Sequence, residues 1–387
     1  MNTKLENKAL TGGAAAAEAL RQINPDVMAA YPITPQTPII ETFAKFEADR
    51  KVDTEIIPVE SEHSAMSACV GSSAAGARTV TATSSQGLAL MNEVLYIASG
   101  TRLPILMLVS SRALGAPINI HNDHGDVMDA RDSGWIQLFS ENVQEVYDNT
   151  TIGLRLAEKA STPVMVIMDG FITSHSVENL ETLPDNDVKN FVGEFHPDKA
   201  LLNIEDPVTF GPVGLPDSYM DFKIDQEKAM QKSGEYFKNI AGEFGSLSGR
   251  NYDEVEEYKT SDAEHIIVIL GSTAGTAKDV VDKLREKGRK AGLLKIKLFR
   301  PFPYEKVSEV LSKGRSVAVM DKTVSFGAYP PLFTEIITAC RLSPISNYVY
   351  SYIYGLGGRD IFAKDIENVF DDLLKGDTRK EVKYISK

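Results

Sequence analysis

Short, continuously apolar segments alternate with helix-forming segments in both halves of the chain, and this alternation restricts the fold more than any other feature. In the first half the apolar segments are residues 27–31, 79–83, 104–110 and 163–168. In the second half they are residues 265–270, 293–298, 316–320 and 348–354. Strands that are apolar on both faces are typical of parallel sheets covered by helices on both sides. We therefore predict an α/β protein whose sheets are mainly parallel.

The alternation also divides the chain into parts. Between residues 181 and 262, charges and several prolines replace the apolar segments, although residues 225–243 have helix-forming composition. We expect residues 181–262 to be a linker or a helical excursion. Residues 1–180 then form one domain and residues 263–387 a second, smaller one. This division suits a chain of 387 residues, because domains commonly span ~100–200 residues.

Charge and cysteine content exclude several classes of function. The net charge is −13 and no basic cluster is present, so we expect no binding to nucleic acid or to a membrane surface. No segment approaches the ~20 apolar residues of a membrane-spanning helix, and the first eight residues lack the apolar core of a secretory signal, so we expect a cytoplasmic protein. Cys69 and Cys340 are too few for a disulfide framework, a zinc site or a four-cysteine iron–sulfur site.

The loop after the first apolar segment is one candidate for a functional site. Ligands of open α/β sheets bind at the carboxyl ends of the strands, so polar residues that follow apolar segments are informative. Residues 31–38 read Tyr-Pro-Ile-Thr-Pro-Gln-Thr-Pro. Proline fixes its own φ and restricts the residue before it, so this loop would hold the Thr34 hydroxyl in one place. The alternative is a strand exit that the prolines end before a helix.

Charged candidates follow two further segments. Glu60 and Glu62 flank a serine at a strand-to-helix junction, where the helix macrodipole alone favours acids. In a functional role, Glu62 would instead enter a dry crevice and bond a ligand nitrogen. Arg112 comes just after the apolar segment 104–110. Its planar guanidinium suits a carboxylate ligand, although an ion pair inside the protein is the alternative.

Two other segments are interpreted structurally. Residues 121–126, His-Asn-Asp-His-Gly-Asp, have the composition of a metal site, but turn formation and helix capping account for them and are preferred. The glycines at 12–13 and the Gly-Leu-Gly-Gly segment at 355–358 lack the spacing and context of a dinucleotide-binding loop. We expect both to be turns that need a positive φ or a close backbone approach.

Seven segments, taken in order, resemble the α subunit of pyruvate:ferredoxin oxidoreductases, within the 2-oxoacid:ferredoxin oxidoreductase family. They are residues 31–38, 60–66, 83–91, 111–113, 169–175, 299–303 and 354–360. The resemblance implies a pyrimidine-type thiamine diphosphate-binding domain followed by a transketolase-C-terminal-like domain. It also implies an enzyme of the pyruvate synthase type, which converts a 2-oxoacid, coenzyme A and oxidised ferredoxin to acyl-CoA, CO2 and reduced ferredoxin.

The resemblance assigns roles to three of the candidates. Glu62 matches the glutamate that bonds the aminopyrimidine ring nitrogen of thiamine diphosphate, so that the cofactor performs its own proton transfer. Thr34 and Arg112 match the residues that hold the substrate, with the hydroxyl on the oxoacid and the guanidinium on its carboxylate. The prolines would then immobilise Thr34 against a small substrate, where positioning governs the rate.

The resemblance further implies that the site is shared with other subunits. Thiamine enzymes usually bind the diphosphate through Mg2+ on a Gly-Asp-Gly segment, which this sequence lacks, so we expect that half of the site on a β subunit and no metal ligand on this chain. The [4Fe-4S] clusters are expected on partner subunits as well. The resemblance implies a dimer of hetero-oligomers with β, γ and δ subunits or fused equivalents. Ferredoxin is expected to interact with this complex rather than with the chain alone.

Pyruvate is the expected substrate, because the loop with Thr34 and Arg112 fits a small monoacid. The same chemistry on 2-oxoisovalerate, 2-oxoglutarate or an aryl 2-oxoacid is one alternative. A scaffold subunit without catalytic function is another, and it would be marked by loss of Glu62, Thr34 or Arg112, all of which are present.

Overall fold

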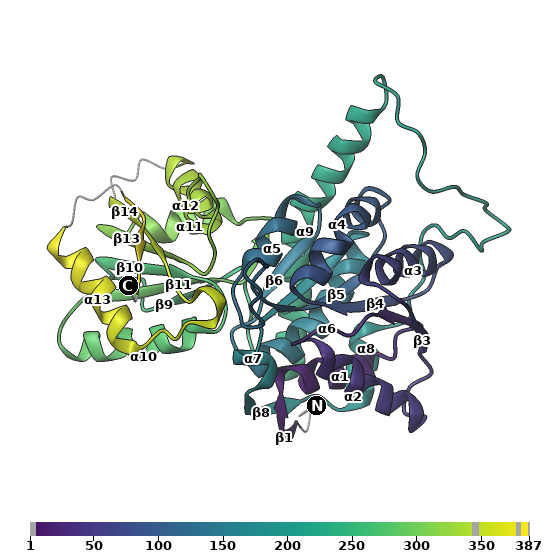
Figure 1. Cartoon of the computed structure of the whole chain (residues 1–387), viewed down its shortest axis with the longest axis horizontal. Helices are drawn as coiled ribbons and strands as arrows, with labels where there is room; N and C mark the ends of the chain where they lie inside the picture. The colour runs from purple at the N-terminus through teal and green to yellow at the C-terminus, as the bar shows by residue number, and fades with distance from the viewer. Residues whose placement is uncertain (1–4, 343–347, 377–380, 386–387) are drawn as a thin grey trace.

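The computed structural model describes residues 5–342, 348–376 and 381–385, and the elements given below belong to these residues. Two α/β domains lie side by side (Figure 1). The larger domain is built on a seven-stranded sheet. Its strands, in spatial order, are β12 (Leu298–Arg300), β6 (Ile136–Phe139), β7 (Val164–Asp169), β5 (Leu106–Ser111), β4 (Thr79–Thr83), β2 (Val27–Ala30) and β3 (Glu55–Pro58). All neighbours are parallel except β12, which runs antiparallel to β6.

The smaller domain is built on a six-stranded sheet. Its strands, in spatial order, are β15 (Lys383–Tyr384), β14 (Tyr348–Ile353), β13 (Ser316–Asp321), β10 (His265–Ile269), β11 (Ala291–Ile296) and β9 (Val255–Tyr258). Only the edge strand β9 is antiparallel to its neighbour in the described part of this sheet. The prediction of an α/β protein with mainly parallel sheets is therefore confirmed.

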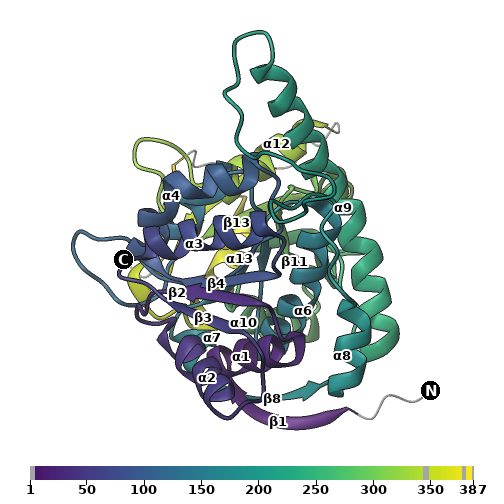
Figure 2. The same ribbon diagram turned by 90° about the vertical axis from the view of Figure 1, so that its right-hand side faces the viewer.

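Helices cover both faces of both sheets, as buried parallel strands require (Figures 1 and 2). In the larger domain the helices are α1 (Gly12–Ile23), α2 (Thr37–Ala48), α3 (Glu62–Ala75), α4 (Ser85–Gly100), α5 (Gly125–Asp129), α6 (Val143–Ala160), α7 (Ile172–His175), α8 (Asp185–Val192) and α9 (Tyr219–Ser248). In the smaller domain they are α10 (Thr273–Glu286), α11 (Tyr304–Leu311), α12 (Pro331–Leu342) and α13 (Ala363–Lys375). Apolar residues of α3 and α4 pack on one face of the larger sheet, and those of α1, α2 and α6 pack on the other.

The segment expected to be a linker or excursion, residues 181–262, contributes to the cores of both domains. Helices α8 and α9 pack against α6, and Phe191, Phe237 and Phe244 are buried there. Strand β9 instead joins the smaller sheet beside β11. The start of the segment pairs with the N-terminus, where β8 (Val177–Thr182) runs antiparallel to β1 (Glu6–Thr11). The predicted helix at 225–243 is part of the longer α9.

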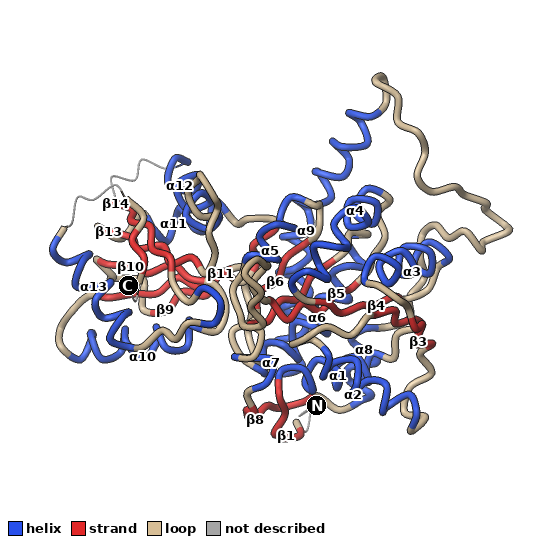
Figure 3. The backbone as a smooth tube through the Cα atoms, viewed as in Figure 1, coloured by secondary structure: helices blue, strands red, loops and turns tan. Residues whose placement is uncertain are grey.

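Residues 193–218 form a long loop between α8 and α9 (Figure 3). Together with the first turns of α9 this loop projects from the body of the larger domain (Figures 1 and 2). Leu202, Ile204 and Val213 on the loop are 75%, 87% and 88% exposed. None of the helices in the described part of the chain combines the length and apolar character that a bilayer crossing demands.

One strand departs from the prediction by changing sheets. The apolar segment 293–298 was expected to be a single strand of the second domain. It is divided between β11, which ends at Ile296 in the smaller sheet, and β12, which begins at Leu298 and pairs with β6 of the larger sheet. This crossing makes the core continuous, because Phe299 packs edge-on against Phe139 of the larger domain with ring centroids 6.0 Å apart.

Candidate active site

The proline-rich loop after β2 is anchored by a buried glutamine. The Gln36 side chain is fully buried, and its Nε2 donates to the carbonyl oxygen of Ala82 in β4 at 2.7 Å. Its Oε1 accepts from the backbone N–H of Ile33 at 3.3 Å. Thr34, between these anchors, is exposed. The loop is therefore held on the sheet while the Thr34 side chain stays accessible to a ligand.

Arg112 lies against this loop. Its Nη1 donates to the carbonyl oxygen of Thr34 at 2.8 Å, and its Nε donates to the carbonyl oxygen of Asn119 at 2.9 Å. Burial lowers the pKa of the guanidinium and nearby Asp126 opposes this. Within the described residues the Arg112 side chain makes no ion pair and its Nη2 has no hydrogen-bond partner. The structure therefore does not contain the internal ion pair considered above, and a donor is left for an anionic ligand.

Asp126, the last residue of the polar segment 121–126, fixes the backbone around Arg112. Its Oδ2 accepts from the backbone N–H groups of Arg112 at 3.0 Å and Ser85 at 2.8 Å. Its Oδ1 accepts from Val127 N at 2.8 Å. Burial raises the pKa of this carboxyl to about 8. Asp126 thus joins the end of β5 to the first turn of α4.

Glu62 is the buried member of the acidic pair, whereas Glu60 is exposed and bonds Ser64 at the start of the same helix. Ser61 caps α3 by accepting from the backbone N–H of Ser64 at 3.2 Å, which places Glu62 at the first helical position. The Glu62 side chain lies over Gly87 of α4: a Cβ added to Gly87 would lie 2.7 Å from Glu62 Oε1 and 2.5 Å from Thr83 Oγ1.

Glu62 and Thr83 lie side by side against Gly87 and offer unused hydrogen-bonding groups. Thr83 Oγ1 is buried and has no hydrogen-bond partner among the described residues, and no hydrogen bond or ion pair of the Glu62 side chain is found among them either. A buried polar atom without a partner is costly and calls for a ligand or water. A carboxylate and a hydroxyl next to each other can hydrogen-bond a ring that carries nitrogen atoms. Glu62 and Thr83 are thus the residues that could hold the pyrimidine of a thiamine diphosphate.

The three predicted site residues lie at one edge of the larger sheet. Thr34 follows β2, Glu62 follows β3 and Arg112 follows β5, and the carboxyl ends of these parallel strands point the same way. A hydrogen bond joins Arg112 to Thr34 directly. No hydrogen bond or ion pair in the described part of the chain joins Glu62 to either of them. The edge thus presents two groups of side chains, one around Arg112 and one around Glu62.

The polar segment 121–126 stabilises the backbone and the domain contact. Asp123 accepts from Gly125 N at 2.9 Å, and Asn122 Nδ2 donates to Ser111 Oγ at 2.8 Å. His124 Nε2 lies 2.8 Å from Asp169 Oδ1, at the end of β7. The side chains face different partners and do not converge. Asp123 forms a turn, as predicted, but the residue that precedes α5, His124, makes no side-chain capping bond.

One acidic cluster has the spacing of a metal site, but lysine already neutralises it. Glu141, Glu145 and Glu256 each offer a carboxylate oxygen within 4.8 Å of the others. Lys295 Nζ lies 2.5 Å from Glu141, 2.8 Å from Glu145 and 2.5 Å from Glu256. Because Glu141 and Glu145 belong to the larger domain and Lys295 to β11, this cluster is an ionic contact between the domains.

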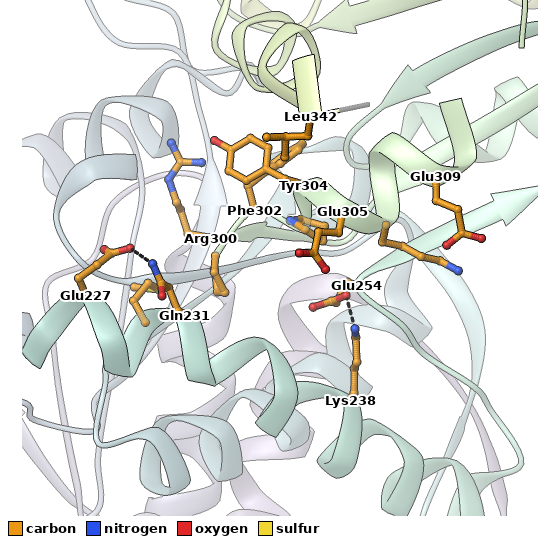
Figure 4. A pocket seen from close by; sticks show the side chains of 14 residues that line it. Glu227, Gln231, Lys238, Glu254, Arg300, Phe302, Tyr304, Glu305, Glu309 and Leu342 are labelled. Atoms are coloured by element: carbon orange, nitrogen blue, oxygen red, sulfur yellow. Dashed lines mark hydrogen bonds and ion pairs between the residues drawn. The ribbon is translucent and has the colours of Figure 1, made fainter. Parts of the chain in front are cut away.

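A cavity of about 810 Å3 lies away from the site, between α9 and the start of α11 (Figure 4). Two of its basic side chains form ion pairs, Lys238 with Glu254 at 2.8 Å and Arg300 with Glu335 at 2.7 Å. None of Glu62, Thr34 and Arg112 lines it.

Comparison with known proteins places this geometry in a family. Residues 18–241 match a family model described as "Pyruvate flavodoxin/ferredoxin oxidoreductase, thiamine diP-bdg", and residues 263–366 match "Pyruvate:ferredoxin oxidoreductase core domain II". A 2-oxoglutarate:ferredoxin oxidoreductase from Magnetococcus marinus, solved with 2-oxoglutarate, coenzyme A and succinyl-CoA bound, shares the fold. Its TM-score is 0.71 at 21% identity, over 96% of this chain and 65% of that one.

Relatives extend over almost the full length. The chain is 55% identical to the pyruvate synthase subunit PorA of Thermotoga maritima, over 97% of this chain and 96% of that one. It is 46% identical to PorA of Methanocaldococcus jannaschii, over 97% of each. It is 41% identical to the ketoisovalerate oxidoreductase subunit VorA of Pyrococcus horikoshii, again over 97% of each. The chain therefore belongs to the pyruvate flavodoxin/ferredoxin oxidoreductase family, among the 2-oxoacid:ferredoxin oxidoreductases.

Proposed function

We propose that this chain is the subunit of a pyruvate:ferredoxin oxidoreductase that binds the pyrimidine of thiamine diphosphate and the 2-oxoacid. The complex would carry out the CoA-dependent oxidative decarboxylation of pyruvate to acetyl-CoA and CO2, with reduction of ferredoxin. The observation that carries this proposal is the contact of Arg112 with the Thr34 loop at the edge that also carries Glu62. The 55% identity to a pyruvate synthase subunit supports the choice of pyruvate.

Each of the three residues has a defined task in this proposal. Arg112 would bind the substrate carboxylate mainly through Nη2, because Nη1 and Nε already donate to Thr34 and Asn119. The Thr34 hydroxyl would donate to the oxo group from a loop that Gln36 keeps in place. Glu62 would hold a proton against the pyrimidine ring nitrogen from its buried position. Bound thiamine diphosphate would supply the nucleophilic carbon and the electron sink for decarboxylation.

The remaining parts of the enzyme are proposed to reside on partner subunits. The sequence has no Gly-Asp-Gly segment for Mg2+ and the diphosphate, and two cysteines do not complete a [4Fe-4S] cluster. We assign the Mg2+ and diphosphate site to a β subunit. We assign the clusters to partners equivalent to γ and δ, in a dimer of hetero-oligomers. Ferredoxins are usually acidic, so ferredoxin would dock on a partner rather than on a chain of net charge −13. The complex would act in the cytoplasm, with coenzyme A.

A second candidate is the same chemistry on 2-oxoisovalerate. The observation that favours it is the 41% identity to a ketoisovalerate oxidoreductase subunit over 97% of the chain. Arg112 and Thr34 would contact the carboxylate and the oxo group of either acid. The side chain that differs between the two acids would then be recognised elsewhere, including on the β side.

The test is a reconstituted complex assayed for CoA-dependent viologen reduction with pyruvate, 2-oxoisovalerate, 2-oxoglutarate and phenylglyoxylate. Pyruvate should give the highest kcat/KM. Glu62→Gln should abolish turnover, and Arg112→Lys should raise KM for every acid because the planar fork is lost. Glu60→Gln is the matched control and should leave turnover unchanged, since Glu60 is exposed. Turnover in Glu62→Gln equal to that of the wild type would favour a scaffold subunit, and preference for another acid would change the substrate.

A further inference from the structure

A glycine-rich turn of the smaller domain contacts the loop that supports Arg112. The turn, residues 355–358, follows β14 and contains the 3-10 helix Leu356–Gly358. Three hydrogen bonds connect it to the larger domain. Asn119 Nδ2 donates to the Gly357 carbonyl oxygen at 3.0 Å, the Gly357 N–H donates to Asp123 Oδ2 at 3.3 Å, and the Gly358 N–H donates to the Asn122 carbonyl oxygen at 2.6 Å.

Two of the glycines are required for two independent reasons. Gly357 and Gly358 have φ of +60° and +78°, which side chains with a Cβ rarely adopt. There is also no room for a Cβ: on Gly357 it would lie 2.4 Å from Asn119 Nδ2, and on Gly358 it would lie 2.4 Å from His121 Cβ. The backbone of the turn therefore packs directly against the side chains of Asn119 and His121.

Asn119 links this turn to Arg112. Its side chain bonds Gly357, while its backbone carbonyl oxygen accepts the hydrogen bond from Arg112 Nε at 2.9 Å. Within its own loop, Asn119 Oδ1 accepts from the backbone N–H of His121 at 2.7 Å, while the flanking Ile118 and Ile120 are 81% and 42% exposed. An exposed loop of this kind is mobile unless its backbone is held. The bond to Gly357 ties the Asn119 side chain to the smaller domain and so helps to hold the Asn119 carbonyl oxygen at the guanidinium.

We propose that the Gly357–Gly358 turn is a positioning element that orients Arg112 towards the 2-oxoacid carboxylate through Asn119. The smaller domain would thereby set the affinity for the substrate without touching it. The inference rests on the proposed function, because it takes the task of Arg112 from there. It explains why a domain outside the thiamine-binding region presents a glycine-rich turn to the active-site loop.

The test is Gly357→Ala in the reconstituted complex. The added methyl should displace Asn119, so KM for the 2-oxoacid should rise by roughly ten- to a hundredfold, the size expected for misplacement by about 1 Å. The KM for coenzyme A should stay as in the wild type. Gly288→Ala is the control: its φ is +75°, so it suffers the same backbone strain, but a Cβ there meets nothing within 4 Å. It should leave every KM unchanged.

A double variant separates positioning from a merely structural effect. In an Arg112→Lys background there is no Nε donor for Asn119, so adding Gly357→Ala should raise KM no further. Asn119→Ala removes the bond to Gly357 and also the bond from His121 N–H, so it should raise KM for the 2-oxoacid at least as much as Gly357→Ala, even if Gly357→Ala folds poorly. Independent, multiplying effects of Gly357→Ala and Arg112→Lys would overturn the inference, as would an equal rise in KM for coenzyme A. Unchanged KM in Arg112→Lys alone would instead contradict the proposed function.

Discussion

Lys322 Nζ lies 2.5 Å from Asp169 Oδ2, and both side chains are almost completely buried. Asp169 ends β7 of the larger domain, and Lys322 follows β13 of the smaller one. His124 at 2.8 Å, the Ser272 hydroxyl at 2.6 Å and the Ser272 backbone N–H at 3.2 Å also bond the carboxylate. Burial alone would raise the pKa of Asp169, but Lys322 and His124 hold it well below its usual range. The pair therefore joins the two domains through a buried charge.

Lys322→Met should destabilise the chain by about 3–5 kcal/mol, because it leaves the Asp169 carboxylate buried without its cation. The free energy of urea unfolding at pH 7 measures this loss. Because the pKa of Asp169 is lowered in the folded state, the stability from this pair is present above the unfolded pKa of ~4 and is lost as the pH falls below it. The loss caused by the substitution should shrink accordingly in acid.

The control for Lys322 is Lys364→Met. Lys364 is 69% exposed and lies 3.3 Å from Glu367, and exposed pairs contribute about 0–1 kcal/mol. Equal losses in the two variants would show that the Asp169–Lys322 pair does not hold the domains together.

Asp321 should make stability fall between pH 5 and pH 7. Its carboxylate accepts from the backbone N–H groups of Leu332 and Phe333 at the start of α12, and burial raises its pKa to about 7. A raised pKa means that the folded state binds the proton more tightly than the unfolded state, so stability decreases with pH up to the folded pKa. The Asp321→Asn variant cannot ionise at this position. The difference between its unfolding free energy and that of the wild type should therefore increase by on the order of 1 kcal/mol for each pH unit across this window.

Urea unfolding of both proteins at pH 5, 6 and 7 measures the difference. Asp262→Asn is the control: Asp262 is exposed, and Arg285 lowers its pKa, so its ionisation is complete throughout the window. A constant difference between Asp321→Asn and the wild type from pH 5 to pH 7 would contradict the raised pKa.

The sequence predicts strands and helices well where a regular pattern of apolar residues is present. It fails where buried charged residues are neutralised by side chains from distant parts of the chain. The segment 79–83 is strand β4 as predicted, and residues 304–311 are helix α11. Helix α6 was not predicted, because its buried face includes Glu145 and Asp148. Lys295 and Arg250 neutralise these acids from positions more than 100 residues away in the chain. No local pattern indicates such a pairing.

The candidate site was predictable to the same extent. Thr34, Glu62 and Arg112 follow apolar segments, so the topology rule placed them at one edge of the sheet. Asn119 was not identified as a site residue, because it bonds the Arg112 guanidinium through its backbone carbonyl oxygen. Asp126 was noticed only as part of the polar segment 121–126, because its bonds to backbone N–H groups follow from the fold. The catalytic and binding roles themselves stay predictions that the variants above test.

Gly87 is the position where the candidate cofactor pocket can be altered without removing a polar group. It lies in the first turn of α4, beneath the Glu62 carboxylate and beside the buried Thr83 hydroxyl. A methyl group here would come within 2.5 Å of Thr83 Oγ1 and 2.7 Å of Glu62 Oε1. Both side chains would have to shift, and the gain of about 1 kcal/mol that alanine brings to a helix offsets part of the cost. The change should therefore displace the Glu62–Thr83 pair while the chain still folds.

Gly87→Ala should lower the turnover of the reconstituted complex by roughly ten- to a hundredfold, because the displaced carboxylate no longer meets the pyrimidine ring. Viologen reduction with saturating pyruvate measures turnover, and circular dichroism of the isolated chain should show that the variant is folded and unfolds cooperatively. Gly242→Ala is the matched control, since Gly242 lies within α9 and a Cβ there meets nothing within 4 Å. It should raise stability by up to about 1 kcal/mol and leave turnover intact. If Gly87→Ala turned over as fast as Gly242→Ala, the position of Glu62 over Gly87 would have no part in catalysis.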